Sequence, residues 1–219
     1  MKRKFVSLVV CLAFIAVFAV PAVIAPAATT APTITSITPN SLGNGNKNAA
    51  VTISGTGFVP GAKVVIVQSG VLHPKKNSGK VTSISADGST ITCNLNLRSA
   101  APGLYDVVVT NKDKGTATLA AGLTVNPHPV VAKPHTPYSG NIGASFSLTL
   151  IGTNFVSGAT VKLTKGSFPD IPVSNVVVSA DGTTLTCDLD LTNAHLGSYK
   201  GVVTNLDGGI GTFHFIGTK

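Results

Sequence analysis

SADGSTITCNLNL runs from Ser85 to Leu97, and SADGTTLTCDLDL runs from Ser179 to Leu191, 94 positions later in the same chain. In both stretches, apolar and polar residues alternate after an Ala-Asp-Gly segment. This alternation predicts a strand with one apolar face, and Asp-Gly predicts a tight hairpin turn before it. The chain therefore contains two copies of one β-rich unit.

Two further pairs of segments support the repeat. SGTGFVPGAKV (Ser54–Val64) matches IGTNFVSGATV (Ile151–Val161) at an offset of 97, and GLYDVVVTN (Gly103–Asn111) matches GSYKGVVTN (Gly197–Asn205) at an offset of 94. The second copy is therefore three residues shorter between the first pair and the Ala-Asp-Gly segment. Because length differences concentrate in surface loops, we expect the Lys-rich segment 68–80 of the first copy to be a loop.

The composition favours strands throughout the body of the chain. The 219 residues include 23 Gly and no Glu, and the body is dominated by Val, Thr, Ser, Gly and Asn. Val and Thr favour strands, and in each copy short apolar runs are separated by Gly, Pro, Asn and Asp turns. About seven short strands in roughly 95 residues predict a β-sandwich of the immunoglobulin type. The predicted fold class is therefore all-β, with two such sandwiches in tandem.

The first 27 residues form a different kind of segment. Lys2, Arg3 and Lys4 precede the apolar run Phe5–Val20, and Ala25-Pro26-Ala27 fits a cleavage site. This order is typical of a secretory signal peptide and predicts a secreted, periplasmic or cell-surface protein. An uncleaved membrane anchor is the alternative, since no charge occurs between residues 5 and 28.

The two cysteines beyond this leader occupy equivalent places in the two copies. Cys93 and Cys187 lie on the apolar faces of their predicted strands. Each should therefore be buried in its own core, too far from the other for a disulfide. We expect two free thiols that act as small buried hydrophobic side chains.

The first copy resembles the IPT/TIG domain family. The resemblance is carried by ITSITPNSLGNG, VTISGTGFVPGAKV, STITCNLNL and APGLYDVVVTN. The second copy departs from the pattern in its opening, VVAKPHTPYSGNIG, and has Gly201 where the first has Val107. The resemblance implies two immunoglobulin-like domains, at residues 33–126 (copy one) and 127–219 (copy two). Such domains occur in cell-surface receptors, exported bacterial proteins, proteins beside polysaccharide-active enzymes and DNA-binding transcription factors, so the resemblance implies the fold and does not choose among these roles.

The segment between the copies contains four Pro. In NPHPVVAKPHTP, prolines at 127, 129, 134 and 137 favour an extended chain. Val130 and Val131 are expected to begin the first strand of copy two. The linker should then be only a few residues long, and the two copies should form a fixed tandem rod.

Residues whose side chains could act in catalysis or metal binding are interpreted first as structural. Asp87 and Asp181 belong to the predicted Ala-Asp-Gly turns, and His128 and His135 flank the linker as solvated loop residues. Outward-facing Asp188 and Asp190 could hold Ca²⁺, but copy one has Asn at both equivalent positions. We therefore predict a non-enzymatic protein with no cofactor and no metal site.

The repeated aromatic residues are also interpreted as structural. Phe58 and Phe155 should fill the cores, and Tyr105 and Tyr199 should form tyrosine-corner contacts. Tyr138 is the only Tyr without a counterpart in the other copy, and the chain has no Trp. An exposed aromatic row for binding sugars is thus not evident.

The positive charge of the chain is concentrated in copy one. Copy one has eight Lys and Arg against three Asp, a net charge of +5, whereas copy two has five of each. Lys75, Lys76 and Lys80 fall in the predicted loop, and they are the candidate residues for contact with a polyanion.

We expect a cell-surface or extracellular module for protein interaction or adhesion. Its partner is another protein or a cell-envelope polymer, anionic polymers included. The alternative is a polysaccharide-binding accessory protein. The leader argues against a nucleic acid partner, and the oligomeric state remains open.

Overall fold

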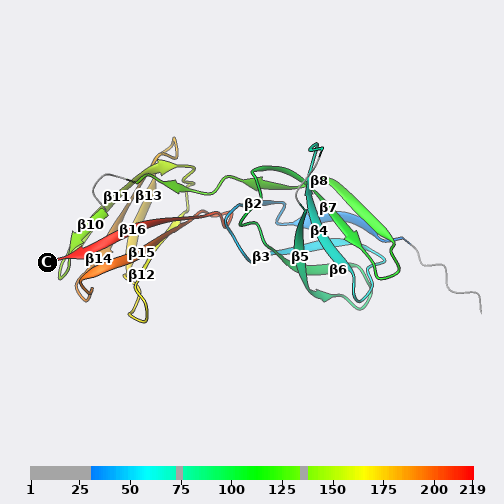
Figure 1. The fold of residues 1–219 in the computed structure, drawn as a ribbon, viewed down its shortest axis with the longest axis horizontal. Helices are drawn as coiled ribbons and strands as arrows, with labels where there is room; N and C mark the ends of the chain where they lie inside the picture. Colours follow the sequence, from blue (N-terminus) through cyan, green and yellow to red (C-terminus); the bar gives the residue numbers. More distant parts are fainter. Residues whose placement is uncertain (1–30, 73–75, 134–137) are drawn as a thin grey trace, which may run out of the picture.

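Strands make up all the regular structure in the computed structural model, which describes residues 31–72, 76–133 and 138–219. The predicted leader, residues 1–27, lies outside the described residues. No helix occurs among the described residues, so none there is long and apolar enough to cross a membrane. Figure 1 shows two β-sandwiches arranged end to end, and the buried apolar residues form one cluster in each copy. The predicted all-β, immunoglobulin-like fold is confirmed.

Copy one is built from a single sheet of eight strands that surrounds one core. The order of strands across the sheet is β1-β3-β6-β5-β4-β7-β8-β2, with β2 parallel to β8 and the other neighbours antiparallel. The strands are β1 (Thr33–Thr38), β2 (Ser41–Gly43), β3 (Ala49–Thr56), β4 (Lys63–Gln68), β5 (Lys76–Ile84), β6 (Thr90–Leu95), β7 (Gly103–Thr110) and β8 (Thr116–Asn126).

The prediction of a loop over residues 68–80 is wrong for its second half. Residues 76–80 belong to β5, where Lys76 pairs with Val67 of β4 and Lys80 pairs with Asn94 of β6. Strand β5 therefore joins the two layers of the sandwich into one sheet. The polar sequence KNSGK has low strand propensity, but residues 76–79 pair with β4 and residues 79–80 pair with β6, which supplies partners for the backbone.

Copy two divides into two sheets of four strands. The sheets have the orders β10-β16-β15-β12 and β13-β14-β11-β9. The strands are β9 (Val130–Val131), β10 (Tyr138–Asn141), β11 (Ser145–Thr153), β12 (Thr160–Thr164), β13 (Val173–Val178), β14 (Thr184–Asp190), β15 (Gly197–Thr204) and β16 (Ile210–Thr218). In the described part of this copy, β12 does not pair with β13, and Leu163 of β12 forms only an isolated bridge with Ile171, which precedes β13. The shorter chain here thus leaves the two sheets separate.

The two cores repeat the same central pairing. Val51 of β3 faces Cys93 of β6, and Leu148 of β11 faces Cys187 of β14. Both thiols are free and buried, as predicted, and burial raises the pKa of each to about 11. A buried thiol remains neutral at physiological pH and packs as a small apolar side chain.

The aromatic residues fill and anchor the cores as predicted. Phe58 and Phe155 are buried. The Tyr105 hydroxyl donates to the carbonyl of Ala101 at 2.9 Å, and the Tyr199 hydroxyl donates to the carbonyl of His195 at 2.9 Å. Each bond spans four residues and closes a tyrosine corner ahead of its strand.

Steric contact explains why copy two has Gly201 where copy one has Val107. Gly201 of β15 faces Phe213 of β16, and a Cβ added to Gly201 would lie 2.3 Å from the Phe213 ring. The ring of Phe213 therefore occupies the space that a side chain at position 201 would need. Phe213 in turn packs edge-on against Tyr138, with ring centroids 5.8 Å apart.

Candidate functional site

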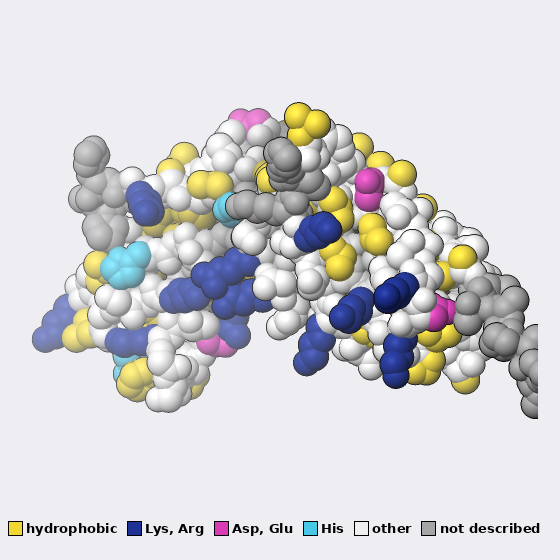
Figure 2. Space-filling model, turned by 45° about the vertical axis from the view of Figure 1, so that its right-hand side comes forward, with side chains coloured by type: hydrophobic (Ala, Val, Ile, Leu, Met, Phe, Trp, Pro, Cys, Tyr) yellow, Lys and Arg dark blue, Asp and Glu magenta, His cyan; other side chains and the backbone are white. Residues whose placement is uncertain are grey.

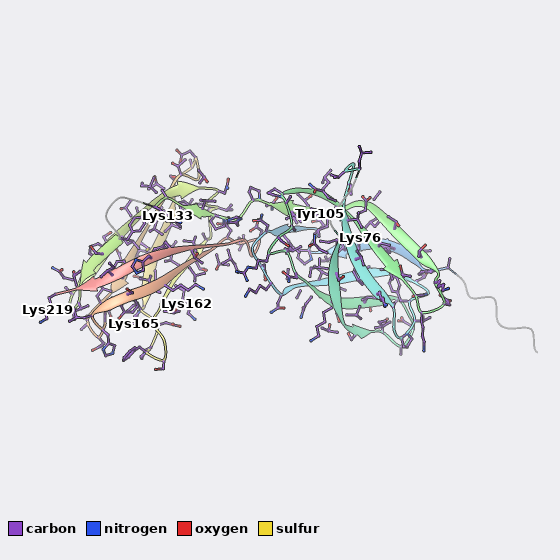
Figure 3. The ribbon with its side chains drawn as sticks, in the orientation of Figure 1. Lys76, Tyr105, Lys133, Lys162, Lys165 and Lys219 are labelled. Carbon is purple, nitrogen blue, oxygen red and sulfur yellow. The ribbon has the colours of Figure 1, made fainter. Side chains whose placement is uncertain are left out.

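The predicted polyanion-contact lysines do not lie together on a loop. Lys75 lies outside the described residues. Lys76 and Lys80 are exposed and project from the same face of β5, about 13 Å apart along the strand. Figure 3 shows Lys76 on copy one and the labelled lysines of copy two spread over that copy. Their contact with a polyanion remains a prediction.

Two lysines of copy two already have partners. The ammonium of Lys162 pairs with Asp170 at 2.7 Å, which is the only salt bridge among the residues the structure describes. Lys165 donates to the carbonyl of Leu196 and lies 5.2 Å from the centroid of the Tyr199 ring. A cation at this distance from an aromatic face is attracted to it, so Lys165 fixes its loop against the tyrosine corner.

The Ala-Asp-Gly segments have the predicted turn structure. The φ angle is 67° at both Gly88 and Gly182, in the left-handed region that glycine tolerates. In copy two, the Asp181 carboxylate accepts bonds from the Ser179 hydroxyl at 2.6 Å and the Thr183 amide at 3.1 Å. These bonds lower the pKa of Asp181. The equivalent Ser85 and Ser89 groups lower the pKa of Asp87 to about 2. Both carboxylates therefore shape turns.

The residues considered for metal binding are dispersed. Asp188 accepts a bond from the Asn175 side chain at 2.8 Å, and Asp190 accepts one from the amide of Thr192 at 3.0 Å. His135 lies outside the described residues. Within the described ranges, no three His, Cys or Asp side chains gather into a group that could hold a metal ion.

Tyr138 is held within the sheet of copy two. Its hydroxyl accepts a bond from the amide of Ile151 at 3.3 Å and donates to the carbonyl of Ala132 at 3.4 Å. The ring is half-buried beside Phe213. A ring tied in this way serves packing, although Tyr138 has no counterpart among the repeated aromatic residues.

The joint between the copies is the feature that sequence reasoning missed. Only three residues, 127–129, separate β8 from β9, as the linker prediction expected. Asn44 is buried at their side, and its side chain donates to the carbonyl of Ala100 at 3.2 Å. Its side-chain oxygen accepts from the amide of His128 at 2.7 Å, and the ring Nδ1 of His128 contacts the same oxygen. His128 is thus half-buried, and the prediction of a solvated loop histidine is wrong.

Copy two contributes the turn between β15 and β16 to the same joint. The amide of Gly43 donates to the carbonyl of Asp207 at 2.9 Å, and the side chain of Asn126 donates to the Asp207 carboxylate at 2.8 Å. The amide of Ile210 donates to the carbonyl of Asn44 at 3.3 Å. Backbones approach so closely that a Cβ on Gly43 would lie 2.3 Å from the Cα of Gly209. The joint therefore holds the two copies by direct hydrogen bonds.

A groove of about 620 Å³ lies along one side of this joint. Its basic residues are Lys47 and Arg98 of copy one and Lys200 of copy two, and His128 also lines it. Among the described residues that line the groove there is no Asp. Figure 2 shows Lys and Arg side chains gathered near the waist between the two copies.

A second cleft, of about 550 Å³, also lies at the joint. Pro127, Val156 and Leu206 supply its apolar lining, and Leu206 is 79% exposed. The joint thus presents a basic groove and a more apolar cleft.

One sequence signal could have indicated the joint. Asn44 of copy one aligns with Ile142 of copy two, so copy one has a polar residue at the joint where copy two has an apolar one.

The family model described as IPT/TIG domain matches residues 32–125, which cover copy one. No curated protein sequence matches the chain.

Among solved structures, an I-band fragment of titin is 18% identical with a TM-score of 0.31, over 86% of this chain and 65% of the fragment. The TIG domain of human nuclear factor of activated T-cells, cytoplasmic 4, is 18% identical with a TM-score of 0.34, over 41% of this chain and 84% of that domain. SGBP-B of the Bacteroides ovatus mixed-linkage glucan utilization locus, in complex with a mixed-linkage heptasaccharide, is 13% identical with a TM-score of 0.33, over 89% of this chain and 47% of SGBP-B. This chain therefore spans less than two thirds of the titin fragment and of SGBP-B. Residues 32–125 of the chain thus match the IPT/TIG domain family, and both copies have an immunoglobulin-like, all-β fold.

Proposed function

We propose that this chain is an exported, non-catalytic module that contacts another protein or a polymer of the cell surface. In this proposal copy one makes the contact through its basic surface, and copy two acts as a spacer. The match of residues 32–125 to the IPT/TIG domain family supports a binding or structural role. The proposal assigns no nucleic acid partner, because the leader predicts export.

The observation that carries the proposal is the placement of Lys76 and Lys80. Both are exposed on one face of β5, in the copy that carries the whole net charge beyond the leader. Neither forms a salt bridge with a described residue, whereas Lys162 of copy two does. Unpaired cations on one face raise the local positive potential and attract polyanions.

The test compares binding of the chain from residue 28 onward to washed cell envelopes and to an anionic polymer, at 0.1 M and 1 M salt. Binding should occur at the lower salt and be lost at the higher, since the Debye length falls from about 10 Å to about 3 Å. The triple variant Lys75→Ser/Lys76→Ser/Lys80→Ser should lose most of the binding. The matched control, Lys63→Ser/Lys112→Ser/Lys114→Ser, removes the same charge from other parts of copy one and should retain it.

Equal loss in the two triple variants would contradict a localised contact. Retention on a neutral polysaccharide at 1 M salt would favour the polysaccharide-binding alternative. Equal retention on double-stranded DNA would argue for nonspecific attraction to any polyanion. Export is tested separately, by determining the N-terminus of the protein recovered outside the cytoplasm, which should be residue 28. An intact N-terminus would favour the anchored form.

A further inference from the structure

We propose that the basic groove at the joint is a binding site for an acidic oligosaccharide, and that both copies are required to form it. The groove uses different side chains from the Lys75, Lys76 and Lys80 contact, so it is a second site beyond the proposed function, and at this site copy two contributes a binding residue besides acting as a spacer. The lysines and the arginine that line it come from three segments. These are the turn after β2, the segment after β6, and β15.

The charge of the groove is not neutralised within the described chain. Lys47, Arg98 and Lys200 are all exposed, and none forms a salt bridge with a described residue. Cations that line one concave surface repel one another and concentrate a positive field there. An anionic group bound between them would relieve this repulsion, and Arg offers a planar fork of donors that suits a carboxylate.

The basic residues of copy one are held in place by backbone bonds. The amide of Leu97 donates to the carbonyl of Asn46 at 2.8 Å, and the amide of Gly45 donates to the carbonyl of Leu97 at 3.1 Å. The side chain of Asn46 accepts from the amide of Asn48 at 2.9 Å. Lys47 therefore projects from a turn whose conformation is fixed next to Arg98. Such preorganisation lowers the entropy that binding must overcome.

Copy two is connected to this turn through the joint itself. The bond from the amide of Ile210 to the carbonyl of Asn44 lies next to the turn that carries Lys47. Lys200 and Val202 are alternate residues of β15, and Val202 pairs with Thr212 of β16. The face that holds Lys200 is thereby positioned against copy one.

The rest of the lining suits a sugar. Asn46, Asn48 and Thr212 offer amide and hydroxyl groups that can bond to sugar hydroxyls. Val202 and Ile210 are half-buried and provide an apolar surface for the C–H face of a sugar ring. Pockets for small ligands commonly combine apolar surface with a few polar groups in about 300–1,000 Å³. Single-stranded nucleic acids instead gain affinity by stacking on aromatic platforms, and no Phe or Tyr is among the described lining residues.

The experiment uses isothermal titration calorimetry on the chain from residue 28 onward. The probes are a galacturonate tetrasaccharide, its neutral galactose counterpart and inorganic tripolyphosphate, each at 50 mM and 500 mM salt. The galacturonate probe should bind at low salt, and the galactose probe should bind at least about tenfold more weakly. Each of Lys47→Ser, Arg98→Ser and Lys200→Ser should weaken binding about tenfold, the usual effect of losing one charge-assisted hydrogen bond.

Two further variants separate the groove from charge in general. Lys219→Ser removes the same charge from the far end of copy two (Figure 3) and should leave the affinity within twofold. Gly43→Val retains every basic residue but forces the copies apart at the joint, and it should abolish binding while the circular dichroism spectrum stays that of a β protein.

The proposal is overturned if the galacturonate probe does not bind, or if Lys200→Ser leaves its affinity unchanged. It is also overturned if tripolyphosphate binds as tightly as the tetrasaccharide, since the site would then recognise charge alone. The proposed function fails by a different result, namely envelope binding that the Lys75→Ser/Lys76→Ser/Lys80→Ser variant retains. The two proposals can therefore fail separately.

Discussion

Replacing Gly43 with Ala tests whether the two copies form one body. The φ angle of Gly43 lies outside the left-handed region, so alanine can adopt the backbone conformation. The added Cβ would nevertheless lie 2.3 Å from both the Cα and the N of Gly209, and 2.6 Å from an Asp207 carboxylate oxygen. Carbon atoms in contact are normally about 3.5–4.0 Å apart, so the two backbones must separate by about 1 Å or more.

This separation should break the hydrogen bonds of the joint. The bond from the Gly43 amide to the Asp207 carbonyl, 2.9 Å long, would exceed hydrogen-bonding distance, and so would the 3.3 Å bond from Ile210 to Asn44. The bond between Asn126 and Asp207 would be strained as well. Three bonds worth about 0.5–1.5 kcal/mol each imply that the coupling between the copies falls by about 3 kcal/mol.

The assay measures residual dipolar couplings of backbone amides by NMR. In the unmodified chain, both copies should fit one alignment tensor, because a fixed joint orients them together. In Gly43→Ala, the two copies should require different tensors, while the chemical shifts of core residues such as Ile53 and Leu150 stay unchanged. Asn141→Ala is the control, because Asn141 is the exposed counterpart of Gly43 in copy two. A single tensor for Gly43→Ala would refute the reasoning, and so would separate tensors for the unmodified chain.

Four other predictions concern the cores, the turns and the division of the chain. The thiol of Cys93, buried and with its pKa raised to about 11, should react slowly with a thiol reagent in the native protein and rapidly in denaturant, and a mass 2 Da below that of the dithiol would contradict free thiols. Gly201→Ala should lower the free energy of unfolding in urea by about 1–3 kcal/mol, because its Cβ would meet the Phe213 ring at 2.3 Å, and adding Phe213→Leu should restore part of the loss. The pKa of Asp87 is lowered from 3.8 to about 2. Its contribution to stability is therefore complete above about pH 4 and disappears as the pH falls toward 2. In Asp87→Asn, this part of the pH dependence should be absent from acid-unfolding curves. Residues 33–126 expressed alone should give a dispersed NMR spectrum with the circular dichroism of a β protein, and an unfolded spectrum would place the domain boundary elsewhere.

Much of the fold could be predicted because it depends on local patterns. A period of two residues predicts a strand with one buried face, and this placed Cys93 and Cys187 in the cores correctly. Asp-Gly predicts a turn because glycine tolerates a positive φ, which the structure shows at Gly88 and Gly182. The repetition of these patterns was enough to predict two sandwiches.

The extent of β5 could not be predicted in this way. Lys, Asn, Ser and Gly have low strand propensity, so the segment before Val81 suggested a loop. The structure extends β5 there because β4 offers backbone partners to residues 76–79 and β6 offers them from residue 79 onward. The lysine side chains at 76 and 80 consequently share the face of a strand. The sequence alone could assign their charge but not their direction.

The joint depends on tertiary structure even more strongly. The bonds from Asn126 to Asp207 and from His128 to Asn44 connect residues 81 and 84 positions apart. No periodicity in the chain links such positions, since their contact arises only after both sandwiches have folded. The sequence by itself determined two β units, their cores and a short linker. Only the packing of one folded copy against the other decided that Lys47, Arg98 and Lys200 line a common groove, because the path of the backbone in three dimensions sets the distance between them.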